Sequence, residues 1–461
     1  YYPNVFTIAN INMSSSAYIE ESDDARRQMQ SFFAMAQLGY KESLYLDVTA
    51  RNDWSSTLAF TERKSRGFFY PSVGLSWIIP KSFSMPSLIS FGKVRASWSK
   101  VGNDIPLFVS NTVGHIAAGG IPQPNDTAPF GTLKPEMSSS FEIGTEWKFF
   151  DYRMDVDLTF YKTNTKNQLF SLPSSAGAAY KYYFVNAGNI QNMGVELTFG
   201  AVPILTNQFK WNTTLNFSRN KNEVKKLHDD LASFIQGDEG FSSSYTMRLV
   251  EGGSFGDIYG KAFERDKYGA IVYGRDGLPQ EIGSGNTAKV GNCNPAFLLG
   301  WGNSFTYKDF SFYFLIDGHF GGDVLAQTQA VLDQTGVSKV SGEARTMGYV
   351  DLEGHHIYNI KGFYEQVGGR NGVTEYYMYD ATNIRLRELS LGYTLPKRLL
   401  GRKQFLKKAE LSFVARNLFF IYKKAPFDPD AVLSASNSNQ GIDIFGIPTT
   451  RSVGFNVKLS F

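Results

Sequence analysis

Apolar and polar residues alternate one by one along most of this chain, and helical spacing of apolar residues is scarce. The clearest stretch is "RSVGFNVKLSF", where Val453, Phe455, Val457, Leu459 and Phe461 alternate with small or polar residues. Successive side chains of a β-strand point to opposite faces of the sheet, so this stretch predicts a strand with one apolar face. Thirteen stretches carry the pattern, which predicts an all-β protein of 13 strands.

These stretches are spread over nearly the whole chain, and their polar faces carry Arg, Asp, Glu and Lys in mid-strand. In chain order they are "FFAMAQLGY", "LYLDVTAR", "SVGLSW", "KVRASW", "FEIGTEWKF", "RMDVDLTF", "GVELTFGA", "FKWNTTLNF", "FLLGWGNSFTY", "FSFYFLID", "RELSLGYTL", "AELSFVARNLF" and the terminal stretch.

Alternation alone fits two architectures. A soluble sandwich packs its apolar faces against a second sheet, whereas a transmembrane barrel turns them to lipid and its polar faces to a watery lumen. Strand length favours the barrel, because the stretches run about 10 to 14 residues while sandwich strands average about five or six and tilted membrane strands about 9 to 11. Aromatic residues, 15% of the chain, gather near strand ends as in the interfacial girdles of such barrels. We therefore expect a transmembrane antiparallel β-barrel.

Composition excludes several other classes. The 461 residues carry a net charge of +3 without clusters of Lys and Arg, which gives no support for nucleic-acid binding. The single cysteine, Cys293, excludes an internal disulfide and a cysteine-based zinc cluster. No apolar run approaches the roughly 20 residues of a membrane-spanning helix.

The loops alternate between short and long. Outer-membrane barrels have short periplasmic turns and long extracellular loops, so turns such as "YKES" at 40–43 are expected in the periplasm. The segment 252–277, rich in Gly and Tyr, predicts a hairpin within an outer loop instead of a wall strand. We expect residues 1–28 to be the tail of an extracellular loop and residues 29–461 to form the barrel, with long loops at 102–137, 166–186, 221–295, 323–380 and 421–447.

Thirteen is an odd strand number, whereas closed bacterial barrels usually have an even one. Two open edges in hydrocarbon would leave many backbone groups unsatisfied, at several kcal/mol each. The pattern therefore predicts partner strands outside these 13, from an N-terminal portion or from another chain.

Several motifs resemble one family. They are, in order, "LYLDVTARNDWSSTL", in which Trp54 stands where Gly is usual, "GFFYPSVGLSWIIPKSF", "GKVRASWSKVGND", "NAGNIQNMGVELTF", "NPAFLLGWGNSFTYKDFSFYFLIDGHFGGDV", "ATNIRLRELSLGYTLPK" and "ARNLFFIYKKAPFDPDAV". Their order and spacing resemble the SusC-like TonB-dependent transporters of the Bacteroidota outer membrane over nearly the whole chain.

The resemblance implies a barrel of about 22 strands, of which this chain supplies about the last 13, and an upstream plug domain with a TonB box. It implies TonB-dependent import of a glycan oligosaccharide, or of a peptide, with a SusD-like surface lipoprotein as partner and no cofactor. Barrels of this kind end on an aromatic residue that the assembly machinery recognises, so Val453, Phe455, Val457, Leu459 and Phe461 are the expected C-terminal signal. The alternative function is a receptor or scaffold barrel that binds surface lipoproteins without transport.

Candidate ligand-binding residues are polar or aromatic side chains near the extracellular ends of the strands. The alternative for all of them is that they anchor loops through hydrogen bonds and ion pairs. No catalytic motif is present, and the adjacent pair His355 and His356 is expected in a solvated loop instead of a metal site, because adjacent side chains point apart in extended chain. The candidates are Arg51, Asp53 and Trp54 on one strand, Asp317 and His319 on another, and Arg385 and Arg387 on a third.

Overall fold

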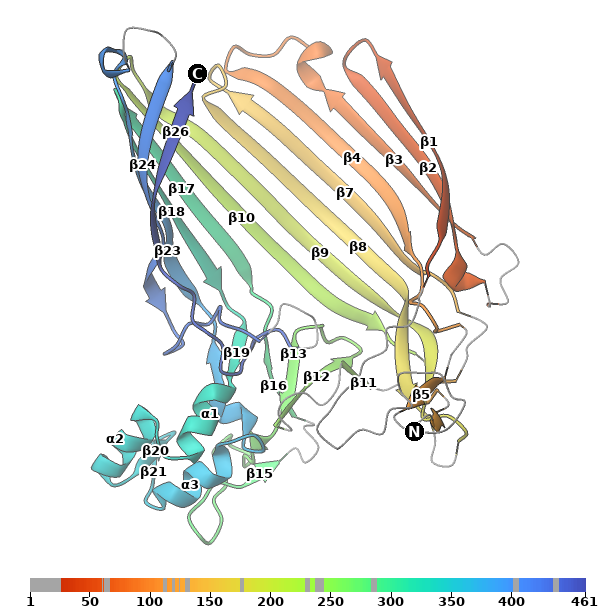
Figure 1. Ribbon diagram of the computed structural model, residues 1–461, viewed down its shortest axis with the longest axis vertical. Helices are drawn as coiled ribbons and strands as arrows, with labels where there is room; N and C mark the ends of the chain where they lie inside the picture. The colour runs from red at the N-terminus through yellow and green to blue at the C-terminus, as the bar shows by residue number, and fades with distance from the viewer. Residues whose placement is uncertain are drawn as a thin grey trace, which may run out of the picture.

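The protein is described by a computed structural model that covers residues 26–59, 61, 67–110, 114–117, 121–123, 125–128, 133–174, 178–228, 233–236, 244–282, 288–400, 406–433 and 439–461. Its main element is one sheet of 13 strands whose order across the sheet is their order along the chain (Figure 1). Most of the expected tail at 1–28 lies outside the described residues. No helix among the described residues is long and apolar enough to cross a membrane.

All thirteen predicted strands are present, and each pairs antiparallel with its neighbours. The all-β prediction is therefore confirmed, and we call this sheet the wall. The wall strands are β1 (Met29–Tyr40), β2 (Leu44–Ser55), β3 (Gly67–Ile78), β4 (Ile89–Asn103), β7 (Glu136–Phe149), β8 (Met154–Pro173), β9 (Tyr182–Leu205), β10 (Phe209–Lys226), β17 (Phe297–Tyr307), β18 (Phe310–Phe320), β23 (Asn383–Thr394), β24 (Lys408–Lys423) and β26 (Ser452–Ser460).

The two faces of the wall differ as the alternation predicts. Apolar side chains such as Ile143 and Leu158 are exposed on one face. On the other face, Arg95 of β4 reaches across β7 to pair with Asp157 of β8, with Nη2 2.7 Å from Oδ1. The guanidinium lies over Gly144, where a Cβ atom would meet Arg95 Cζ at 2.8 Å. Glycine at this position therefore lets a lumen-facing ion pair span three strands.

The connection between β8 and β9 is shorter than the loop expected at 166–186. Strands β8 and β9 continue as a long hairpin, with pairs from Gln168↔Ala187 to Pro173↔Tyr182, so only residues 174–181 connect them. The extension is stable because Phe170 and Leu172 are buried in a small apolar cluster above the wall. The small and turn-forming residues of "SSAGAAYK" at 174–181 indicate a turn, but they do not predict where the flanking strands end.

The long connections 227–296 and 321–382 fold together into a subdomain beyond one end of the wall (Figure 1). As predicted, the segment 252–277 lies outside the wall, and its residues Arg265 and Ile271 form an antiparallel bridge. The subdomain contains β11 (Ser233–Gln236), β12 (Tyr245–Val250), β13 (Asp257–Gly260), β14 (Ala262–Phe263), β15 (Glu281–Ile282), β16 (Ala288–Asn292), β19 (Asp323–Ala326), α1 (Gln327–Gln334), α2 (Lys339–Met347), β20 (Val350–Leu352), β21 (His355–Ile357), α3 (Ile360–Val367), η4 (Thr374–Tyr377) and β22 (Met378–Asp380).

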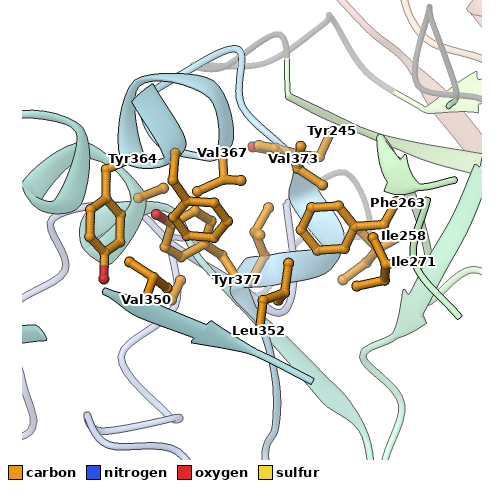
Figure 2. Close-up of a cluster of buried hydrophobic side chains, with 14 of the residues drawn as sticks. Tyr245, Ile258, Phe263, Ile271, Val350, Leu352, Tyr364, Val367, Val373 and Tyr377 are labelled. Carbon is orange, nitrogen blue, oxygen red and sulfur yellow. The ribbon is translucent and has the colours of Figure 1, made fainter. Parts of the chain in front are cut away.

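A compact apolar core holds this subdomain together (Figure 2). Phe363 and Val367 of α3 are fully buried with Ile258 of β13 and Tyr377 of η4. The three helices are not predicted from the sequence, because each has only eight or nine residues and they lie in a connection expected to be a loop. The remaining short elements are η2 (Ser56–Leu58), η3 (Ile79–Lys81), β5 (His115–Ala117), β6 (Ile121–Gln123), η5 (Lys397–Leu399) and β25 (Ile442–Asp443).

Candidate functional site

A pocket of about 470 Å³ opens on the polar face of the wall, near the end that carries the long connections. Strands β9, β10, β17, β18 and β23 contribute to it, and the loop after β24 closes one side. Its polar lining includes Glu196, Asn216, Asp317, His319, Arg387 and Asp430.

The strand register explains why these side chains meet. Gly300 of β17 lies opposite Asp317 of β18, so the polar side chain faces an open position. The pairing of β18 with β23 is irregular between Leu315 and Ile316, and β23 shifts against β24 near Arg387. Such a bulge re-aims a side chain, and Arg387 thereby reaches the pocket.

The pocket combines an ion pair with unpaired acceptors. Arg387 Nη2 lies 2.6 Å from Asp317 Oδ2 and 3.5 Å from Asp430 Oδ2. Asp317 Oδ1 and His319 Nε2 are buried and have no hydrogen-bond partner among the residues that the structure describes. Buried polar atoms are nearly always satisfied, so each of these two atoms needs a hydrogen-bond partner that the described side chains do not supply.

Arg385 is buried and holds a loop against the wall. It is 1% exposed, and its Nη2 lies 2.8 Å from Asp428 Oδ1 and 3.1 Å from Asp430 Oδ2. Its guanidinium also stacks over the ring of Phe420, 4.1 Å from the centroid. These contacts fasten the loop after β24 to the wall, which is the anchoring role that the sequence left open for this residue.

Arg51 and Asp53 form a separate cluster on β2. Arg51 Nε lies 2.7 Å from Asp53 Oδ1, and the hydroxyl of Tyr70 donates to Asp53 Oδ2. Trp54, the third candidate on β2, lies by strand alternation on the opposite, apolar face, where it pairs with Gly67, and its contact with a ligand stays a prediction. The structure does not bring this cluster into the pocket at β18 and β23.

The five residues of the expected C-terminal signal share the outward face. Their side chains are exposed, from 46% for Leu459 to 85% for Phe455. β26 is an edge of the sheet and its polar-face residues are exposed as well, so alternation assigns these five residues to one face. Their recognition during assembly stays a prediction.

Sequence reasoning missed three members of the pocket. Glu196 and Asn216 alternate with apolar neighbours and gave the right signal, a polar side chain in mid-strand. Asp430 follows β24 in a connection, where no alternation marks it, and it binds both Arg385 and Arg387. Within the described ranges, no three His, Cys, Asp or Glu side chains are grouped as metal ligands would be.

Comparison with known proteins shows the family. A family model for "TonB dependent receptor-like, beta-barrel" proteins matches residues 1–270, more than half of the chain. The chain belongs to this family. It is therefore an outer-membrane protein of the TonB-dependent receptor type.

Two curated relatives illustrate the match. TonB-dependent receptor P3 of Formosa agariphila is 26% identical over 97% of this chain and 47% of its own length. TonB-dependent receptor SusC of Bacteroides thetaiotaomicron is 22% identical over 96% of this chain and 46% of its own length. The chain thus spans about half the length of the curated relatives it matches.

Among solved structures, the RagAB peptide importer in its closed-closed state superposes with a TM-score of 0.76. The identity is 18%, and the match covers 100% of this chain and 50% of that one. This likeness shows that the open 13-stranded sheet has the fold of a barrel wall.

Proposed function

We propose that this chain forms part of the wall of a transporter that imports a saccharide across the outer membrane, with energy delivered through TonB. An upstream plug and further wall strands complete the barrel, and a SusD-like surface lipoprotein covers its outer face. The observation that carries the proposal is the lumen pocket, in which Asp317 Oδ1 and His319 Nε2 lack partners. Unpaired acceptors suit a ligand rich in hydroxyl donors.

A second cavity, of about 790 Å³, lies by β4, β7, β8 and β9 and supports a polar, hydrogen-bonding cargo. Its lining combines amide side chains and aromatic rings with four charged residues, Arg27, Asp104, Lys134 and Glu136. Planar hydrogen-bonding groups beside apolar surfaces are what binding sites use to orient a small polar ligand. The amides are Asn103, Asn167, Gln168 and Asn186, and the aromatic residues are Phe170, Phe234 and Phe255.

Uptake of radiolabelled oligosaccharides by cells that carry the whole transporter tests the proposal. We expect uptake that stops when the proton gradient is collapsed and that falls at least tenfold in Asp317→Asn. Asp155→Asn is the matched control, since this carboxylate also lies on a wall strand, β8, outside the pocket. Uptake of peptides in place of every saccharide tested would contradict the substrate class.

The second candidate is a barrel that binds surface lipoproteins and transports nothing. Ion pairs that fasten loops to the wall, as at Arg385, would serve either function. Binding of oligosaccharide without gradient-dependent uptake would favour this second candidate.

A further inference from the structure

The hairpin β20–β21 presents an aromatic face to the outside of the loop subdomain. Asp351 pairs with His356 across the two strands, and Tyr349 and Tyr358 flank this pair on the same side by strand alternation. Tyr358 is 74% exposed, and the side chain of His356 is 46% exposed. Four neighbouring side chains therefore form one outward row, which we call the outer platform: Tyr349, Asp351, His356 and Tyr358.

The aromatic rings of the outer platform contact one another. The ring of Tyr349 stacks on His356, with centroids 4.0 Å apart and planes 25° apart. Tyr358 meets Tyr349 edge-on, with centroids 6.4 Å apart. Aromatic pairs in these geometries stabilise each other, so the platform is ordered before any ligand arrives.

The opposite face of the hairpin is fixed to the subdomain. Val350, Leu352 and Ile357 are buried in its core, and His355 packs on the ring of Tyr273 with centroids 4.0 Å apart. The two adjacent histidines thus point to opposite faces, as predicted. The turn is held by the Gly354 amide, which donates to Asp351 Oδ1 at 2.8 Å.

The size of the platform suits a small ligand. Two residues along the strands span about 7 Å, and neighbouring strands lie about 5 Å apart. A stable protein interface covers roughly 800 Å² on each partner, far more than this face supplies. One or two pyranose rings match the area, and their apolar C–H faces can lie on exposed aromatic rings.

The chemistry beside the rings suits hydroxyl groups. Asp351 offers carboxylate oxygen, and His356 offers a ring nitrogen 4.0 Å from Asp351 Oδ2. An apolar surface with a few convergent polar groups is how proteins orient small ligands. No Lys or Arg belongs to the row, so the platform has no fixed cation with which to select an anionic sugar.

We propose that the outer platform is a second saccharide-binding site, outside the lumen, that captures a neutral oligosaccharide at the cell surface. This inference rests on the proposed function, because it assigns the same class of cargo to an outer site. Tyr358 supplies the exposed ring, Tyr349 and His356 support it, and Asp351 accepts hydroxyl hydrogen bonds.

Affinity electrophoresis of the whole purified transporter tests this site. The probes are native gels that contain starch, laminarin, xyloglucan, galactomannan or xylan. We expect at least one of them to retard the wild-type protein, Tyr358→Ala to weaken that retardation at least tenfold in apparent affinity, and Tyr358→Phe to retain most of it. Tyr268→Ala is the matched control, since Tyr268 is 82% exposed in the same subdomain but is absent from the row.

The outcomes separate the two proposals. Equal retardation of wild type and Tyr358→Ala, or no retardation by any polysaccharide, would overturn the outer site. Loss of a co-purifying lipoprotein in Tyr358→Ala, with unchanged retardation, would also overturn it in favour of a protein contact. Gradient-dependent uptake that survives in Tyr358→Ala but fails in Asp317→Asn would leave the import function standing without the outer platform.

Discussion

The apolar face of β26 allows a quantitative test of how the wall lies in the membrane. Ser460 pairs with Lys408, the first residue of β24, which marks one rim of the wall. Phe455 precedes Ser460 by five positions, or about 12 Å along the membrane normal at about 3.3 Å per residue and a tilt of about 45°. This is the middle of an apolar band about 25 Å tall. Phe455 lies on the apolar face of the alternation, opposite Phe413 of β24, and this is the face that we assign to lipid.

We expect Phe455→Lys to destabilise the whole transporter by about 2–4 kcal/mol relative to Phe455→Leu, because a lysine at the bilayer midplane loses its hydration. Leu459→Lys, close to the rim on the same face, should cost about 0–1 kcal/mol. Asn456→Lys, on the polar face, should also cost less than 1 kcal/mol or so.

Equilibrium unfolding of the transporter from phosphatidylcholine vesicles in guanidinium chloride, followed by tryptophan fluorescence, measures these differences. A cost for Asn456→Lys equal to that of Phe455→Lys would refute the assignment of faces. A cost for Leu459→Lys equal to that of Phe455→Lys would refute the assigned depth.

Two further predictions concern the pocket and the loop subdomain. Arg385→Ala should lower the free energy of unfolding by about 3–5 kcal/mol, because it leaves the buried carboxylate of Asp428 without its cation. Limited proteolysis should then cut the loop after β24 faster in Arg385→Ala than in Arg387→Ala, since the Arg387 side chain is partly exposed. Burial raises the pKa of Asp333, so the stability that this group contributes is present at low pH and is lost as pH rises through its folded-state pKa. Hydrogen exchange in α1 should therefore be better protected at acidic than at neutral pH, after correction for intrinsic rates, and Asp333→Asn should reduce that difference.

The wall was predictable because alternation is a local property of the chain. In "RMDVDLTF" the polarity of each residue indicates the face of the strand on which it lies. Because a slip of one residue would move every apolar side chain to the other face, a face covered by protein or lipid fixes the register. By the same rule Trp54, the neighbour of Asp53 in β2, lies on the apolar face.

The loop subdomain was not predictable in the same way. Its core joins Ile258, Phe363 and Tyr377 from connections more than 100 residues apart, and no local pattern records that contact. The pocket lies between these cases. Asp317 and His319 were expected near a strand end, but their convergence with Arg387 and Asp430 depends on strand pairing and on the fold of the loop after β24.

The central claim is that this chain is a membrane wall with lipid on one face and a watery lumen on the other. Spin labels at successive positions of β8, from Asp155 to Tyr161, test it directly in the whole transporter in lipid vesicles with Cys293 replaced by alanine. We expect oxygen, which concentrates in lipid, to relax the labels at 156, 158 and 160. A water-soluble nickel chelate should relax the labels at 155, 157, 159 and 161, which face the lumen. Accessibility that does not alternate along β8 would contradict it.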